Sequence, residues 1–160
     1  MIKTNNDTDF VRDCVEWGYS KHPGVRPTCD DKEKEMKVAY VFATNMASSF
    51  KLATMILPQL EQGIHGAKVV GMMFFDDNIF CLRVGDPVGE RLARIAKEQG
   101  ILLMVCDQCA VRRGLAEGTF DQCGTGSVKA KGMVGGVVCG CFPQLYAALS
   151  EAMPDQVITL

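Results

Sequence analysis

The sequence has almost no surplus of charge of either sign. Its 17 Lys and Arg residues nearly balance its 19 Asp and Glu residues, which leaves a formal net charge of −2 over 160 residues. Binding to nucleic acid or to an anionic membrane surface through the overall electrostatic field requires a basic excess, so we expect neither partner. Hydrophobic residues make up 48% of the chain and charged residues 22%, as in ordinary globular domains.

A long uninterrupted apolar segment is also missing. The first ten residues, MIKTNNDTDF, are polar where a signal peptide has an apolar run. The longest stretch without charge, residues 132–150, contains four glycines, a proline and a glutamine, which makes it a poor membrane span. We therefore expect a cytoplasmic protein without a membrane segment.

Cysteine, in contrast, is abundant, with eight residues in the chain. An even number of cysteines in a small secreted protein suggests a disulfide framework, but this sequence shows no secretion signal. The spacings are local, because Cys106 is followed by Cys109 and Cys139 by Cys141. In a reducing compartment such pairs favour catalytic, redox or metal chemistry over structural bridges.

Patterns typical of strands and helices alternate from residue 37 onward. Residues 1–36 predict an N-terminal extension with a short helix and a proline-containing connector, and residues 37–160 predict one α/β domain. Strands are expected at 38–43, 68–75, 101–105, 134–138 and 156–160, and helices at 46–62, 86–100, 108–117 and 142–153. Short connections between alternating elements predict a three-layer α/β/α fold with a mostly parallel five-stranded sheet and helices on both faces.

This architecture predicts where the cysteines lie. Sites in open parallel sheets form at the carboxyl ends of the strands. Cys106 ends the predicted third strand, and Cys139 and Cys141 follow the predicted fourth strand. Both pairs are therefore expected at the same edge of the sheet, close together if the two strands are neighbours.

The surroundings of Cys106 favour an anionic sulfur. The residue precedes a predicted helix, whose unpaired N–H groups stabilise negative charge. Arg112 and Arg113 follow in that helix, and a nearby guanidinium favours thiolate over thiol. The pattern predicts a nucleophilic Cys106 with Cys109, Arg112 and Arg113 beside it.

The segment Ile101–Leu115, ILLMVCDQCAVRRGL, resembles the DsrE-like (DsrE/DsrF/TusD) sulfurtransferase family, in which a strand ends in cysteine and a helix carrying Arg-Arg-Gly follows. The resemblance covers about residues 37–160 and implies the DsrE-like fold. It implies that Cys106 accepts persulfide sulfur and passes it to an acceptor thiol. It also implies donor and acceptor proteins or small persulfides as partners, no cofactor, and a homotrimer or homohexamer.

Two other functions remain open from the residues alone. One is a thiol–disulfide oxidoreductase built on Cys106 and Cys109. The other is a zinc or iron–sulfur module with Cys106, Cys109, Cys139 and Cys141 as ligands. Cys139, Cys141 and the loop residue Cys123 are predicted to be auxiliary thiols.

The remaining candidates favour a structural interpretation. Cys14, Cys29 and Cys81 are interpreted as structural or incidental, and His22 and His65 as surface or turn residues. Asp76 and Asp77 are interpreted as a polar loop and helix start.

Overall fold

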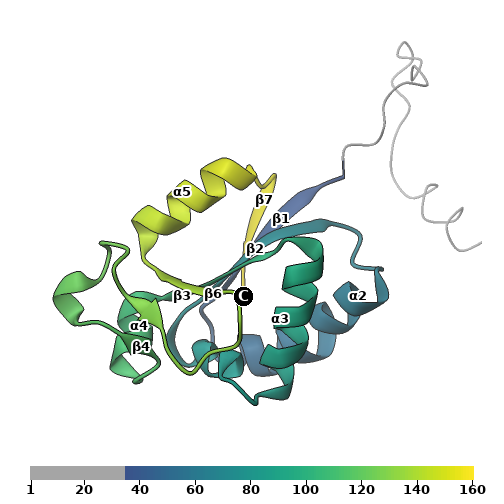
Figure 1. Cartoon of the computed structure of the whole chain (residues 1–160). Coiled ribbons are helices and arrows are strands. Elements are labelled where there is room, and N and C mark those ends of the chain that lie inside the picture. The colour runs from purple at the N-terminus through teal and green to yellow at the C-terminus, as the bar shows by residue number, and fades with distance from the viewer. Residues whose placement is uncertain (1–34) are drawn as a thin grey trace, which may run out of the picture. The chain divides into compact units, whose positions relative to one another are not determined.

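Five strands form one sheet in which each neighbouring pair runs parallel, in the order β6-β3-β2-β1-β7. A computed structural model describes residues 35–160 (Figure 1). The strands span Lys37–Phe42 (β1), Lys68–Phe74 (β2), Leu102–Cys106 (β3), Val137–Gly140 (β6) and Gln156–Thr159 (β7).

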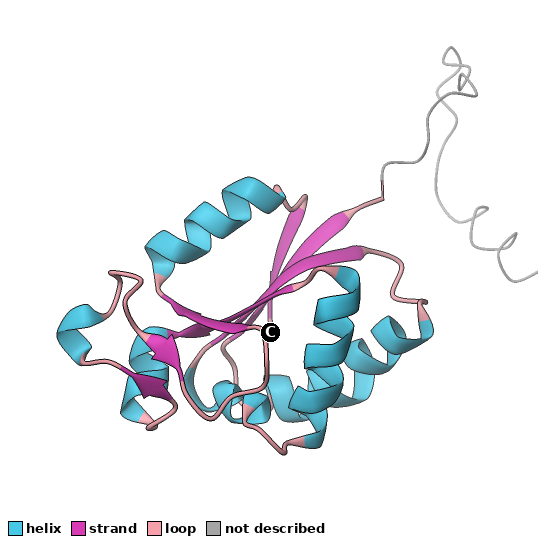
Figure 2. Cartoon of the chain, in the orientation of Figure 1, coloured by secondary structure: helices cyan, strands magenta, loops and turns pink. Residues whose placement is uncertain are grey.

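Helices cover both faces of this sheet, as Figure 2 shows. One face carries η1, a π-helix at Ala47–Ile56, with the helices α2 (Leu57–Gln62) and α3 (Pro87–Gln99) and the 3-10 helix η2 (Asp76–Leu82). The other face carries α5 (Phe142–Ala152). The predicted α/β fold with a five-stranded parallel sheet is therefore confirmed.

The carboxyl end of β3 carries the smaller elements. Helix α4 (Asp107–Arg112) follows β3 directly. A two-stranded antiparallel pair comes next, formed by β4 (Ala116–Glu117) and β5 (Lys129–Ala130), with the 3-10 turn η3 (Phe120–Gln122) between them. The glycine-rich segment 118–132 is thus part of a hairpin that lies beside α4.

The sheet core is apolar on both faces because the central strands are apolar along their whole length. On the α3 face, Phe42 stacks on Phe74 with ring centroids 4.7 Å apart. On the α5 face, Leu145 packs with Met73 and Met104. Burial of these side chains is the main stabilising term of the fold.

Helix α3 has the boundaries that its sequence predicts. The Asp86 carboxylate caps the first turn by accepting hydrogen bonds from Val88 N and Gly89 N at 2.9 and 3.3 Å. Pro87 occupies the first turn, where its missing N–H costs nothing. Gly100 ends the helix in the left-handed conformation, with φ 69°.

The segment predicted as one helix over 46–62 is a π-helix that continues as α2. The change falls next to Pro58, which has no N–H for either ladder. Leu57 and Leu60 are buried, whereas Phe50, which an α-helical period places on the same face, is 53% exposed. The wider π turn changes which side chains share a face, so an α-helical period misplaces Phe50.

Two further boundaries differ from the prediction. The helix expected over 108–117 ends at Arg112, because Gly114 turns the chain with φ 67°. The strand expected over 134–138 lies at Val137–Gly140, because Gly136 turns with φ 86° before the strand begins. Cys139 is consequently inside β6 and does not follow it.

The predicted N-terminal extension, with its helix, Cys14, Cys29 and His22, lies outside the described residues apart from residues 35 and 36. Among the helices of residues 35–160, none combines the length and the apolar character that crossing a bilayer requires.

Candidate functional site

An open hollow of about 510 Å³ lies where β2 and β3 end and α4 begins. Its lining residues are Asp76, Asp77, Phe80, Cys106, Gln108, Cys109, Arg112 and Arg113. We call it the dithiol pocket. It brings together all four residues predicted as catalytic, at the sheet edge where sites of parallel sheets form.

Cys106 is the N-cap residue of α4. Its sulfur accepts the backbone N–H of Cys109 at 3.4 Å, the contact that a capping side chain makes. The residue is only 8% exposed, and burial raises the pKa of the Cys106 thiol to about 12, although the Cys109 N–H acts in the opposite direction. The prediction that Cys106 is a thiolate is therefore wrong for the chain by itself, because desolvation of the sulfur outweighs the one N–H donor of a six-residue helix.

Cys109 is the more accessible thiol of the pair. It is half-buried, and its sulfur accepts the backbone N–H of Asp76 at 3.2 Å. A hydrogen bond also joins the two thiol groups. Each sulfur thus has one backbone N–H donor, which stabilises whichever of them carries negative charge.

Asp76 holds its N–H toward Cys109 through an unusual backbone conformation. Its φ is 49°, in the left-handed region that non-glycine residues rarely adopt. The residue lies directly after Phe75, where the chain leaves β2 and turns into η2. Strain of this kind concentrates at functional sites, which supports a role for this turn.

Arg113 directs its charge to carboxylates. Its Nε and Nη2 lie 2.9 and 2.7 Å from Asp77 Oδ1, and Nη2 lies 3.9 Å from Asp76 Oδ1. Burial lowers the pKa of Arg113, but the hydrogen bond and charge of Asp77, together with the charges of Cys109 and Asp76, raise it by more, so the guanidinium stays charged. The arginine lines the pocket as predicted, with its charge largely balanced by these two carboxylates.

Arg112 lies on the outer side of the pocket. Its guanidinium carbon is 5.3 Å from the centroid of the Phe120 ring, in cation–π geometry. Phe120 belongs to the loop between β4 and β5. Arg112 therefore joins the pocket to this loop.

The auxiliary thiols lie apart from Cys106. Strands β3 and β6 are neighbours, as the close approach of the two pairs requires, and Cys139 pairs with Val105. Because side chains alternate along a strand, Cys106 and Cys139 point to opposite faces of the sheet. Burial raises the pKa of Cys139 to about 11, with a further increase from Asp107 and Cys123.

Cys123 and Cys141 share these surroundings with Cys139. The pKa of Cys123 is raised by burial and then by the Asp107 carboxylate, which forms a hydrogen bond with the thiol. Cys141 follows β6 and is the N-cap residue of α5. Asp107 is only 1% exposed, and its carboxylate raises the pKa of Cys106, Cys123 and Cys139.

Within residues 35–160, no three or more Cys, His, Asp or Glu side chains are arranged to hold a metal ion. The four proposed ligands are divided between the dithiol pocket and the neighbourhood of Asp107. The described part of the chain thus gives no support to the zinc or iron–sulfur alternative.

The sequence interpretation missed the role of Asp76 and Asp77. They begin η2, as predicted, but they also bind Arg113 and contact Cys109. The signal was their position at the carboxyl end of the second strand, the same edge as Cys106. Phe80 was missed too, because nothing in its sequence neighbourhood separates a pocket wall from a core residue.

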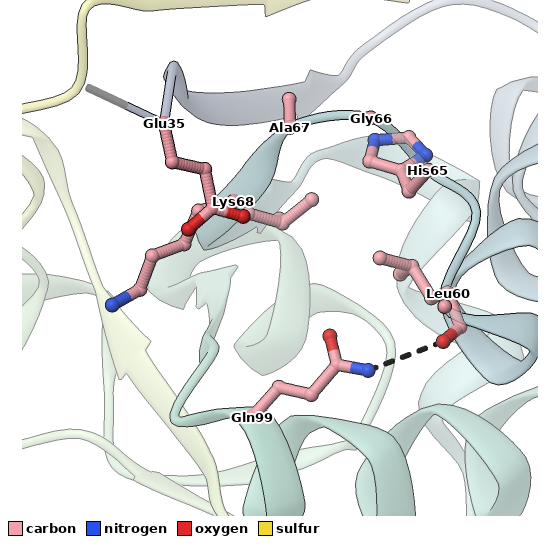
Figure 3. Close-up of a pocket in the computed structure, with 9 residues that line it drawn as sticks. Glu35, Leu60, His65, Gly66, Ala67, Lys68 and Gln99 are labelled. Atoms are coloured by element: carbon pink, nitrogen blue, oxygen red, sulfur yellow. Dashed lines mark hydrogen bonds between the residues drawn. The ribbon is translucent and has the colours of Figure 1, made fainter. Parts of the chain in front are cut away.

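A second hollow, of about 450 Å³, lies at the opposite end of the sheet, where β2 begins (Figure 3). His65 lines it and is not a simple turn residue. Its Nε2 lies 2.9 Å from the Tyr40 hydroxyl and its Nδ1 lies 3.0 Å from Gln59 Oε1. Burial lowers the pKa of His65, which favours a neutral imidazole in this hydrogen-bonded chain.

Cys81 is buried, in keeping with the structural interpretation, and its thiol donates to Asn78 O.

Comparison with solved structures identifies the fold. The chain superposes on the crystal structure of the ychN protein from E. coli with a TM-score of 0.51. The alignment covers 79% of this chain and 100% of YchN, at 16% sequence identity. The fold is DsrE-like. At this identity the likeness concerns the fold alone. No protein-family model matches the sequence, and no curated protein does.

Proposed function

We propose that this protein is a sulfur carrier that accepts sulfane sulfur from a persulfide at Cys106 and passes it to an acceptor thiol. The observation that supports it is the dithiol pocket, in which two adjacent cysteine sulfurs each accept a backbone N–H at the open edge of a DsrE-like sheet. A persulfide on either sulfur is an anion at neutral pH, and these donors suit it.

The transfer step is an exchange at sulfur. The Cys106 sulfur attacks the outer sulfur of the donor persulfide, forms a new S–S bond and breaks the S–S bond of the donor. The donor leaves as a thiolate and takes up the proton that Cys106 releases. No net oxidation occurs, so the step needs no redox cofactor.

Burial of Cys106 has a role in this scheme. The high pKa keeps the free thiol protonated and unreactive toward adventitious electrophiles. A donor persulfide that occupies the pocket can accept the Cys106 proton on the sulfur that leaves as a thiolate. The half-buried Cys109 lies between Cys106 and Asp76, where it can guide the incoming sulfur.

The contact between the Cys106 and Cys109 thiols supports a second candidate function, a dithiol oxidoreductase. Because the Cys106 and Cys109 thiols hydrogen-bond to each other, Cys109 can attack the inner sulfur of a Cys106 persulfide. That attack forms a Cys106–Cys109 disulfide and expels hydrosulfide, and an external thiol must then reduce the disulfide.

Intact-mass spectrometry of the anaerobically purified chain, before and after incubation with a persulfide donor, tests both functions. Carriage predicts a gain of one sulfur mass in the wild type and in Cys109→Ser, and none in Cys106→Ser. Oxidoreductase function predicts hydrosulfide release and a Cys106–Cys109 disulfide in the wild type, with both lost in Cys109→Ser. Equal sulfur gain in the wild type and in Cys106→Ser would remove Cys106 from the proposed role.

We also propose that copies of the chain self-associate through α5 and β7. Tyr146 on α5 is 62% exposed and Val157 on β7 is 50% exposed. Within residues 35–160, α5 alone covers this face of the sheet, as Figure 1 shows. Exposed apolar side chains on an incompletely covered sheet face suit a contact with a second copy.

A further inference from the structure

A second group of thiols lies beside the dithiol pocket and takes no part in the proposed sulfur transfer. Cys123 is on the loop between η3 and β5, and Cys141 is the N-cap residue of α5. Both thiols are free and half-buried. They come from segments 18 residues apart in the chain, so their proximity is a product of the fold.

One glutamine side chain brings the two segments together. Gln144 Nε2 donates to Gly124 O at 2.9 Å, and Gln144 Oε1 accepts from Cys141 N at 3.0 Å. The same amide group therefore contacts the backbone of Cys141 and the backbone of the residue that follows Cys123. Two hydrogen bonds and one amide group span the whole distance between the two backbones.

Asp107 holds the loop from the other side. Its Oδ2 accepts the Gly124 N–H at 2.6 Å, so both backbone groups of Gly124 are hydrogen-bonded. Gly124 and Gly126 both have φ 81°, a conformation that glycine adopts without strain. The Cys123 thiol contacts Thr119 O at 3.8 Å and interacts with the Asp107 carboxylate.

Cys141 is better placed than Cys139 to react with Cys123. Cys139 lies inside β6, where its backbone is fixed by pairing with β3. Cys141 lies beyond the strand, and its thiol faces the first turn of α5. The Cys123 sulfur interacts electrostatically with both Cys141 and Cys139, so the preference for Cys141 rests on the position of its backbone beyond the strand.

We propose that Cys123 and Cys141 form a second dithiol site, which reacts with small-molecule disulfides and closes an intrachain disulfide. The Cys123 thiolate attacks one sulfur of the small disulfide, breaks its S–S bond and releases one thiolate. The Cys141 thiolate then attacks the Cys123 sulfur and releases the second. The two thiol protons pass to the two leaving groups, so the pair is oxidised by two electrons and the small disulfide is reduced by two.

Closure of this disulfide ties the loop covalently to the start of α5. The loop also carries Phe120, whose ring lies under the Arg112 guanidinium of the dithiol pocket. Closure of the second site therefore restrains the residue that Arg112 contacts. Burial, and then the neighbouring Asp107 carboxylate, raise the pKa of Cys123 and disfavour its thiolate, so closure accelerates as the pH rises.

The test uses the full chain with Cys106→Ser and Cys109→Ser, so that the dithiol pocket contributes no thiol. The chain is incubated with oxidised glutathione, quenched with acid, alkylated and mapped by peptide mass spectrometry. We expect a mass lower by two hydrogens and a peptide that joins Cys123 to Cys141. Adding Cys139→Ser should leave this peptide unchanged. Adding Cys141→Ser should stop the reaction at a glutathione adduct on Cys123.

Two results would overturn the proposal. One is full alkylation of Cys123 and Cys141 after the incubation, and the other is a peptide that joins Cys123 to Cys139. The same mapping on the wild type guards against a folding defect of the double variant. Because the readout contains neither Cys106 nor Cys109, failure of sulfur loading leaves this result interpretable.

Discussion

Arg113 binds Asp77 through two guanidinium nitrogens, Nε at 2.9 Å and Nη2 at 2.7 Å, and this pair controls the charge at the dithiol pocket. The guanidinium also interacts electrostatically with Cys109, one helical turn before it. Asp77 and the pocket thiols therefore compete for the same positive charge.

Removal of the Asp77 charge should activate the pocket. In Asp77→Asn the guanidinium of Arg113 loses its nearest carboxylate and keeps only the more distant Asp76, so we expect alkylation of Cys109 at neutral pH to accelerate by about two- to tenfold. Iodoacetamide labelling with peptide mass spectrometry gives the rate. Glu98→Gln on the exposed surface of α3 makes the same change of charge away from the pocket, and an equal acceleration there would refute the local explanation.

Cys106 should react slowly until the solution is strongly alkaline. Its pKa is raised to about 12, so the protonated thiol dominates at neutral pH and the alkylation rate should rise about tenfold per pH unit below that value. The chain unfolded in urea is the control, since its Cys106 rate should level off near pH 9.0, the ordinary value for a thiol. A folded-state rate that levels off at the same pH would contradict the desolvation argument.

Leu145 links the stability of α5 to the protection of Cys106, because both side chains belong to one small cluster with Met73 and Met104. Leu145→Ala should destabilise the fold by about 2–3 kcal/mol in urea unfolding. It should also raise the labelling rate of Cys106, whose cover is thinned. Leu149→Ala on the same helix, at a partly exposed position, should cost less and leave the Cys106 rate nearly unchanged. If Cys106 labelling is equally slow in both variants, α5 does not protect this thiol.

Self-association should depend on the exposed face of α5. Light scattering coupled to size-exclusion chromatography is expected to show a mass above that of one chain, and Tyr146→Glu should lower it by placing charge on the contact surface. Lys97→Glu on α3, which lies on the other face of the sheet, is the matched control and should leave the mass unchanged. A wild type with the mass of one chain would contradict the proposed contact.

The fold could be predicted from the sequence because its strongest signals are local. The apolar run over Val38–Phe42 and the cap formed by Asp86, Pro87 and Gly100 each specify one element without reference to the rest. Gly136 and Gly114 mark the failures. A glycine that turns before a strand or ends a helix early shifts the boundary of an element by a few residues, and hydrophobic periodicity does not register such a shift.

The candidate site was harder to predict because it depends on burial and register. Arg112 and Arg113 were correctly placed beside the thiols, but the sequence does not show that Asp77 takes the guanidinium charge. Nor does it show that Cys106 is desolvated, which reverses the expected direction of its pKa shift. The opposite faces of Cys106 and Cys139 follow from a strand that begins three residues later than expected.

The left-handed conformation of Asp76 serves the thiol chemistry of the dithiol pocket but lowers the stability of the fold. An L-residue at φ 49° costs about 1–2 kcal/mol, and glycine would remove that cost while keeping the N–H that reaches Cys109. The same replacement would delete the carboxylate near Arg113 and loosen the turn that aims the donor. Replacing Asp76 with glycine should therefore raise the stability of the fold, but it should also weaken the thiol chemistry of the pocket.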